Sequence, residues 1–364
     1  MQLRNKLLSW FILVVIAAAV STVSAKPRKR QAHREGNGSQ SFVIYQNELG
    51  STICRKATDI ERQRIVERGG GQSTVIYPGA PLRSKMPFGT TSWTLDSAGL
   101  VLQPSAGLRI VLHGTTQLDQ NPTAKNAFIA AANHWEAIIA TPITVVIDVD
   151  YGANFFGTPY PDSSILGATG LDTFQGPFSD LRQRLINGAS NSAEQQLYNA
   201  LPLSSVPVDF NGVLSDITSA SLALPNARAL GLVPDIANPD ALSLGQGDAG
   251  IGFNSAFQFD FTPDDGISTG LTDFDAVATH EIGHALGFIS ESGGTSASPV
   301  SVWDLFRFRP SAVSLANFPT VSRIMSKGGS QIFFSNQIST FATSELGLST
   351  GGPDPDPGDG DGRQ

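Results

Sequence analysis

Apolar residues predict a strand, a helix and a second strand at the start of the main part of the chain. Residues 108–113 form one apolar run, and residues 143–149 form another that is rich in β-branched side chains. Residues 122–139, between the two runs, are predicted to form a helix with Pro122 near its start, where a helix tolerates proline. This order of elements predicts a mainly parallel sheet.

The clearest helical pattern lies in residues 272–287. Thr272 and Asp275 resemble a capping box, which predicts the start of the helix, and Gly287 predicts a stop or a sharp turn. Alternating apolar residues at 249–261 predict a strand that leads directly into this helix. The apolar side chains recur at helical spacing and predict one buried stripe: Phe274, Ala278, Ile282 and Ala285.

Weaker signals predict further elements. The middle of the chain is rich in Gly, Pro and Ser and otherwise gives few periodic signals. The expected elements are a strand at 41–45, a short charged helix that begins at Thr58 and Glu61 and ends at 69–71, a helix at 193–200, an aromatic-rich segment at 302–308 that packs beneath the motif helix, and a short strand at 332–334.

The two ends of the chain differ from its main part. Residues 1–25 predict a secretory signal, because Arg4 and Lys6 precede an apolar stretch and small residues lead to a cleavage point after Ala25. The alternative is an uncleaved membrane anchor, since a basic run follows at once. We expect residues 26–100 to form an N-terminal accessory or pro-region and residues 101–350 to form the main domain. Residues 351–364 contain only Gly, Pro, Asp, Arg and Gln, which predicts a disordered tail or a loop.

Composition and charge exclude some classes of partner. With 364 residues, of which 40% are hydrophobic, the chain is long enough to bury a sizeable core. A net charge of −8 argues against nucleic acid as a partner. We expect a secreted protein, extracellular or periplasmic, that contacts a membrane only if the N-terminal segment is not cleaved. The sequence leaves the oligomeric state open.

The motif His280-Glu281-Ile282-Gly283-His284 carries the candidate chemistry. Two histidines four positions apart project from the same face of a helix and can bind one zinc ion. Glu281 lies beside them, where it can take a proton from a water molecule. We therefore expect one catalytic zinc ion, with Glu281 as the general base. The alternative is a core helix whose histidines only bind neighbouring polar groups.

A third protein ligand for zinc is harder to place. A catalytic zinc normally has three protein ligands, and no histidine follows His284. Asp304 is our choice within the chain, because it follows His284 by a spacing typical of a carboxylate ligand on a later helix. Its alternative roles are to accept a hydrogen bond from a zinc-bound histidine or to pair with Arg307. Glu291, close to the helix end, is a further candidate, and we expect His33, His113 and His134 to be structural.

Cys54 is the only cysteine, which excludes an internal disulfide. Two interpretations are open for it. Thiolate binds zinc well, so Cys54 could bind the ion from a removable N-terminal segment and keep an enzyme latent. The alternative is a small buried side chain.

The stretch 273–288, followed by Ser301-Val302-Trp303-Asp304-Leu305-Phe306-Arg307, resembles a family of secreted bacterial zinc metalloproteases with the sequence HEIGHALGF. It is more distantly similar to leishmanolysin-type metzincins, although Ser290 stands where the extended metzincin motif has its third histidine. The likeness covers roughly residues 100 to 350 and is strong only around these two motifs. In leishmanolysin-like enzymes the third histidine lies in a later His-Trp segment, so the resemblance places it beyond Gln364 and makes Met325 an ordinary core residue.

The resemblance implies an α/β (α+β) fold, in which residues 101–350 form a metzincin-like catalytic domain with a mixed twisted sheet and the motif on its active-site helix. The expected function is a secreted zinc-dependent metalloendopeptidase that acts on protein or peptide substrates. Two alternatives stay open. One is a catalytically incomplete binding or adhesion protein on the same fold, and the other is a zinc hydrolase with non-peptide substrates.

Overall fold

The computed structural model describes residues 38–47, 52–66, 73–79, 94–95, 101–102, 107–262, 266–294, 296–309, 313–326, 331–334 and 340–342. The expected signal segment at 1–25 and the tail at 351–364 lie outside the described residues. Among the helices that are described, none combines the length and the apolar character needed to cross a membrane.

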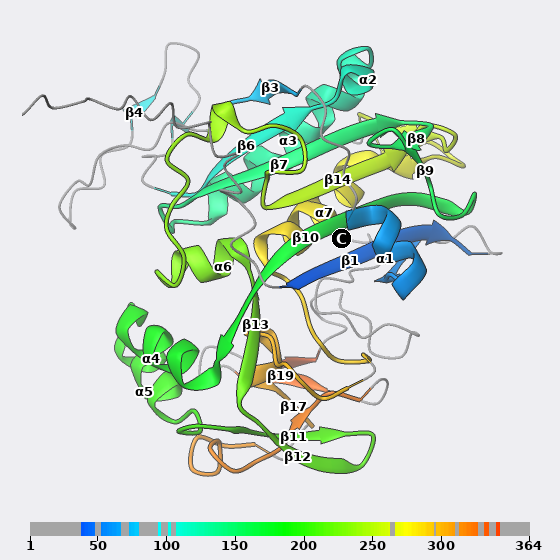
Figure 1. Ribbon diagram of the computed structural model, residues 1–364. Coiled ribbons are helices and arrows are strands. Elements are labelled where there is room, and N and C mark those ends of the chain that lie inside the picture. Colours follow the sequence, from blue (N-terminus) through cyan, green and yellow to red (C-terminus); the bar gives the residue numbers. More distant parts are fainter. Residues whose placement is uncertain are drawn as a thin grey trace, which may run out of the picture. The chain divides into compact units, whose positions relative to one another are not determined.

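A mixed sheet of eight strands forms the centre of the fold (Figure 1). Its order is β2 (Thr52–Lys56), β1 (Gly38–Gln46), β10 (Ile165–Pro177), β14 (Ala249–Asn254), β7 (Thr144–Gly152), β6 (Arg109–Gly114) and β3 (Thr74–Tyr77), and β13 (Ser219–Ala223) also pairs with β10. Strands β14, β7 and β6 are parallel. The other pairs are antiparallel, so β10 runs against the parallel strands.

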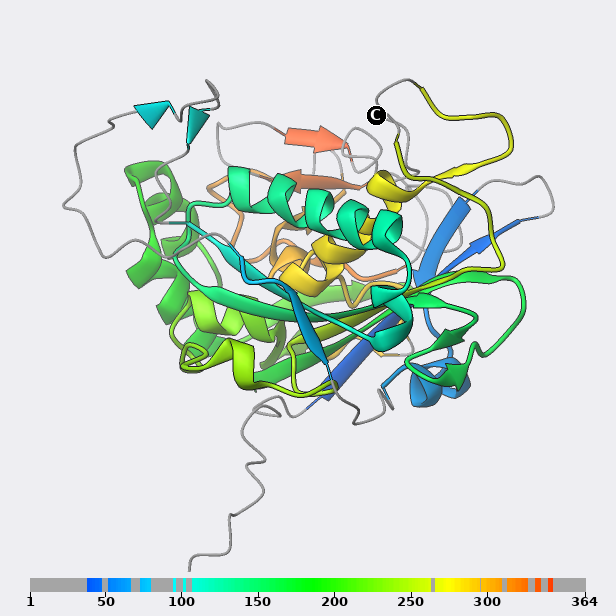
Figure 2. The same cartoon turned by 90° about the horizontal axis from the view of Figure 1, so that it is seen from above.

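Two long helices lie side by side on one face of this sheet (Figure 2). They are α3 (Pro122–Ile138) and α7 (Phe274–Leu286), and α2 (Thr116–Asp119) precedes them. Phe128 of α3 and Phe253 of β14 meet Phe274 of α7 with ring centroids 5.1 and 5.0 Å apart. On the opposite face, Ile65 of α1 (Asp59–Val66) packs in a cluster with Val43 of β1.

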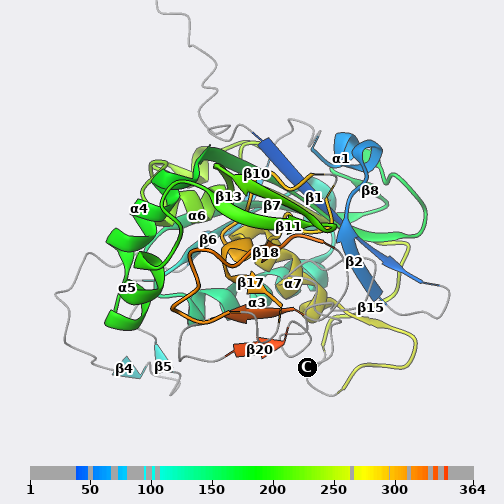
Figure 3. The same ribbon diagram turned by 90° about the horizontal axis from the view of Figure 1, so that it is seen from below.

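A second hydrophobic core packs against Phe174, in the second half of β10. Figure 3 shows β10 with α4 and β13, two of the elements that contribute to this core. Arg323 is buried there, with its guanidinium 4.9 and 4.8 Å from the ring centroids of Phe308 and Phe318. Met325 is buried in the same core, as expected of an ordinary packing residue. The elements of this part are α4 (Phe178–Gly188), α5 (Ser192–Asn199), α6 (Leu224–Ala229), β11 (Val206–Phe210), β12 (Val213–Ile217), η3 (Trp303–Phe306), β17 (Arg307–Phe308), β18 (Arg323–Ile324), β19 (Ile332–Phe334) and β20 (Thr340–Ala342).

Short elements complete the description. They are β4 (Thr94–Leu95), β5 (Val101–Leu102), β8 (Asn154–Phe155), β9 (Thr158–Pro159), η1 (Pro239–Ala241), β15 (Phe259–Asp260) and β16 (Thr272–Asp273).

The structure confirms the predicted strand, helix and strand as β6, α3 and β7. The strands expected at 41–45 and 332–334 and the helices expected at 193–200 and from residue 58 are also present as β1, β19, α5 and α1. Thr58 and Glu61 form the capping box of α1, since the Thr58 amide donates to the Glu61 carboxylate at 2.7 Å. The expected end of this helix at 69–71 lies outside the described residues.

Two local predictions were wrong. The strand expected over 249–261 ends at Asn254, because the Asn254 side chain accepts a hydrogen bond from the Ala256 amide at 3.0 Å and turns the chain. The helix that follows is capped by Asp273 rather than by Thr272, since the Asp273 carboxylate accepts from the Ala276 amide.

Three of the described strands of the segment 26–100 belong to the main sheet. They are β1 and β2 at one edge and β3 at the other. The mixed sheet with helices on both faces agrees with the expected α/β (α+β) class. The prediction of a mainly parallel sheet was wrong, because only β14, β7 and β6 run parallel and β1, β2, β3, β10 and β13 pair in antiparallel fashion.

Candidate metal centre

Helix α7 holds the motif in a fixed orientation. Asp273 caps its first turn, and Gly287 ends it in the left-handed conformation with φ of 105°, which glycine adopts without steric cost. The predicted stripe of Phe274, Ala278, Ile282 and Ala285 is fully buried. The motif side chains therefore project from another side of the helix.

Four side chains meet at that side: Cys54, His280, Glu281 and His284. Their candidate ligand atoms all lie within 4.8 Å of one another. Cys54 Sγ lies 3.5 Å from Nε2 of His284 and 3.9 Å from Oε1 of Glu281. Nε2 of His280 lies 3.8 Å from the same Glu281 oxygen. Side chains of β2 and of α7, which lie more than 200 positions apart in the sequence, thus form one cluster.

The donor atoms fit a zinc ion. A sulfur and a nitrogen that bind one tetrahedral zinc at about 2.3 and 2.1 Å are about 3.6 Å apart, close to the separation of Cys54 Sγ and His284 Nε2. Nδ1 of His284 lies 2.9 Å from the carbonyl oxygen of Phe288. When Nδ1 donates to this oxygen, Nε2 keeps a lone pair for a metal, an arrangement common in zinc sites.

His280 also has a ring nitrogen that needs a partner. Nε2 of His280 is buried and makes no hydrogen bond within the described part of the chain. A buried imidazole nitrogen without a partner is costly, and a metal ion would satisfy it.

Burial sets the charge of the motif in the absence of a metal. It lowers the pKa of His280 to about 4 and holds the pKa of His284 well below its usual value, so both imidazoles are neutral, as metal ligation requires. Burial raises the pKa of Glu281 to about 7, against the opposing effect of hydrogen bonds from Thr169 and Cys54. The Thr169 hydroxyl, on β10, donates to Oε2 of Glu281 and so fixes the carboxylate.

Other side chains cover the motif face of α7 in this structure. Glu281 and His284 are both 0% exposed. The ring of Phe42, on β1, stacks on the His284 imidazole with centroids 4.0 Å apart and planes 5° from parallel. Side chains of β1 and β2 therefore lie over this face of the helix.

Asp304 lies elsewhere, contrary to its assignment as the third ligand. It is not a member of the four-residue cluster, although it belongs to the described residues. Its Oδ1 accepts a hydrogen bond from Ser290 Oγ at 2.5 Å, and its Oδ2 accepts from the backbone amides of Glu291 and Ser301 at 3.0 and 2.7 Å. Asp304 thus fixes the loop after α7.

The other expected candidates are placed outside the cluster as well. The Glu291 carboxylate accepts from Gln40 and pairs with Lys56. His113 is buried on β6 with Nδ1 3.8 Å from Asp148, and His134 lies 3.1 Å from Asp275. Neither histidine belongs to the cluster, and His33 falls outside the described residues. The expected packing of 302–308 is seen at Trp303, whose ring nitrogen donates to the Gly287 carbonyl at 3.1 Å.

Cys54 is the one member of the cluster that reasoning from sequence did not select as a site residue. It is buried, as one interpretation held, and it lies beside the zinc motif, as the other required.

No family model, curated protein or solved structure matches the chain.

Proposed function

We propose that the protein is a zinc metallopeptidase of the metzincin-like type that hydrolyses peptide bonds. The observation that supports this proposal most directly is the cluster of two neutral imidazoles, a thiol and a carboxylate whose ligand atoms lie within 4.8 Å. A helix of the core that needed no metal would not gather four such groups around an unsatisfied nitrogen.

Each motif residue has a distinct role. His280 and His284 would hold the ion, which when bound supplies Lewis-acid chemistry by polarising a peptide carbonyl and acidifying water. Glu281 accepts the proton of the attacking water and passes it to the leaving amine. Thr169 donates to one Glu281 oxygen and leaves the other, Oε1, directed toward the histidine and thiol side of the cluster.

Burial alone raises the pKa of Glu281 to about 7, and a bound zinc ion would lower it toward the ionised form that a general base needs.

Zinc content and substitution test the proposal. We expect one zinc ion per chain, retained by Glu281→Gln and lost from His280→Ala and His284→Ala. Chelator-sensitive cleavage of casein or of a peptide panel should disappear in all three variants. His134→Ala is a matched control, because this histidine lies on α3 away from the cluster.

Other results would favour the alternatives. A folded chain that binds no zinc supports the catalytically incomplete binding protein. Zinc binding with cleavage of amides or esters but not of peptides supports a different hydrolase. The expected secreted location remains a prediction, which N-terminal sequencing of the exported protein tests.

A further inference from the structure

We propose that a polar pocket beside the start of β1 binds the amino end of an extended peptide, which adds a short strand to β1 and places its ammonium group against Glu291. None of the residues that line this pocket belongs to the four-residue cluster around the zinc motif. The inference therefore does not depend on the proposed function.

The pocket lies where β1 lacks a neighbouring strand on one side. Strand β1 pairs with β10 from Gly38 onward, whereas its ladder with β2 begins only at Phe42, opposite Lys56. After Lys56 the chain makes one more bond to β1, from the Ala57 amide to the Ser41 carbonyl at 2.8 Å, and then enters α1. Among the described strands, none pairs with this side of β1 before Ser41.

Ser39 therefore presents its backbone groups to the pocket. In an antiparallel pair, every second residue directs its N–H and C=O toward the same neighbouring strand. Because the Ser41 carbonyl faces the β2 side, the N–H and C=O of Ser39 face that side too. Ser39 lines the pocket, and the edge of a sheet is a common site for recognition of an extended peptide. A peptide residue opposite Ser39 can exchange two backbone hydrogen bonds with it.

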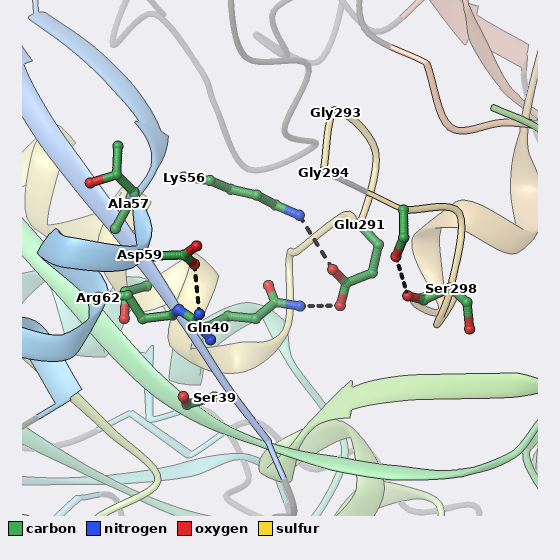
Figure 4. Close-up of a pocket in the computed structure, with 13 residues that line it drawn as sticks. Ser39, Gln40, Lys56, Ala57, Asp59, Arg62, Glu291, Gly293, Gly294 and Ser298 are labelled. Atoms are coloured by element: carbon green, nitrogen blue, oxygen red, sulfur yellow. Dashed lines mark hydrogen bonds and ion pairs between the residues drawn. The ribbon is translucent and has the colours of Figure 1, made fainter. Parts of the chain in front are cut away.

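Two walls shape this edge into a slot (Figure 4). Asp59 and Arg62 of α1 lie on one side of β1, and Glu291 and Gly293 of the loop after α7 lie on the other. The slot has a volume of about 530 Å³, and apart from Ala57 its lining residues are polar, charged or glycine. It therefore suits a hydrophilic chain rather than an apolar ligand.

The charge of the second wall favours a cation. The Glu291 carboxylate accepts a hydrogen bond from the Gln40 amide and pairs with Lys56 at 3.4 Å, a distance longer than the roughly 2.7–2.9 Å of a strong charge-assisted hydrogen bond. Burial and the nearby Asp304 carboxylate raise the pKa of Glu291, and Lys56 only opposes them. A further cation beside Glu291 would stabilise its ionised form.

Two atoms of β1 in this slot also need partners. Oε1 of Gln40 and Oγ of Ser41 are buried and make no hydrogen bond to any described residue. Both residues line the slot. A peptide with a free amino end brings three N–H donors on its ammonium group, together with its backbone amides, and these can satisfy both oxygen atoms.

Strand direction and charge agree on the orientation of the peptide. A peptide that continues the line of β2 runs antiparallel to β1, so its first two residues lie opposite Gln40 and Ser39. Its amino end then lies beside Gln40, whose side chain donates to Glu291. A peptide in the opposite direction would bring its own carboxylate to Glu291, and the two negative charges would repel each other.

Calorimetric titration of the intact chain with short peptides tests the site. A chelator in the buffer prevents hydrolysis, so the result does not depend on peptidase activity. The reference peptide is Gly-Ser-Ser-Gly with an amidated carboxyl end, and it is compared with the same peptide acetylated at its amino end. We expect the free amino end to bind about tenfold more tightly, because a hydrogen bond between charged groups contributes more than a neutral one.

A second peptide tests strand addition. Gly-Pro-Ser-Gly with an amidated carboxyl end should bind about fivefold more weakly than the reference peptide, since proline has no N–H for the Ser39 carbonyl. Glycinamide alone should bind more weakly still, because it carries the ammonium group without a second residue to pair with Ser39.

Two variants assign the preference to one wall. Glu291→Gln should remove most of the preference for the free amino end. Asp59→Asn is the matched control, because Asp59 is an exposed carboxylate on the opposite wall, paired with Arg62 at 2.7 Å, and this variant should keep the preference. Urea unfolding shows whether both variants are folded.

Several results would overturn the proposal. Equal binding of the free and acetylated peptides excludes recognition of the amino end, and binding of the proline peptide or of glycinamide as tightly as the reference peptide excludes strand addition. Absence of binding by every peptide excludes the site. None of these results bears on the proposed function, which fails separately if the chain binds no zinc and cleaves no peptide.

Discussion

Replacement of Asp304 separates a role as a metal ligand from a role in fixing the loop after α7. The carboxylate is fully buried and accepts three hydrogen bonds, from Ser290 Oγ and from the amides of Glu291 and Ser301. Asp304→Ala leaves all three donors without their acceptor. We expect it to destabilise the protein strongly while zinc binding persists.

The magnitude follows from the three donors. A buried donor that loses its partner costs about 1–3 kcal/mol, and water or a shift of the loop can satisfy part of this loss. We therefore expect a decrease of about 3–5 kcal/mol in the free energy of unfolding. Asp304→Asn should cost only about 1–2 kcal/mol, because its amide oxygen can still accept from both backbone amides and its amide nitrogen can donate to Ser290.

Urea unfolding of the metal-free proteins measures these differences, and equilibrium dialysis with zinc measures binding. Both variants should bind one zinc ion under conditions in which they are folded. The reasoning is refuted if Asp304→Ala unfolds at the same urea concentration as the unmodified chain but no longer binds zinc, since that result would make Asp304 a ligand after all.

Three further predictions follow from other contacts. Arg55, which donates to Glu61 at 2.7 and 2.8 Å, lowers the pKa of Glu61 to about 2. Its stabilising effect is thus complete above about pH 4.5 and lost as the pH falls toward about 2. Glu61→Gln should lower stability by up to about 2 kcal/mol at pH 7, and a difference from the unmodified chain that persists undiminished at pH 2 would contradict this. Gly287→Ala should cost more than about 2 kcal/mol in chemical unfolding, since a Cβ would meet Asn226 Oδ1 at 1.8 Å and φ is 105°; an unchanged midpoint would show that this turn adapts. Zinc at about 100 times its Kd should stabilise the unmodified chain by about 2.7 kcal/mol and His284→Ala by almost nothing in thermal melts, and equal shifts would point to a different site.

Local sequence patterns were sufficient to locate α7, β6, α3 and β7, because helical spacing and β-branched runs act over a few positions, although they placed the cap of α7 one residue too early. The same patterns did not predict β10. This strand contains Gly167, Ala168 and Gly170, and its first nine residues are all buried, so it shows no alternation of polar and apolar side chains.

The cluster of Cys54 with His284 could not be predicted from spacing, since 230 positions separate the two residues. Their contact depends on two tertiary events, the pairing of β1 with β10 and the packing of α7 under the same strand. Sequence reasoning could state only that a thiolate suits zinc. The structure places Asp304 outside the cluster, and spacing alone does not distinguish a carboxylate that binds a metal from one that accepts from backbone amides.

The length of β10 has a consequence for the cooperativity of folding. Its first half packs in the cores that contain β1 and α7, and its second half, paired with β13, lies in the core that contains α4 and Phe318. One uninterrupted strand of 13 residues thus belongs to both hydrophobic cores. Neither core can open without breaking hydrogen bonds along this strand, so its amide hydrogens should exchange with solvent only through global unfolding, and the two cores should melt in a single transition.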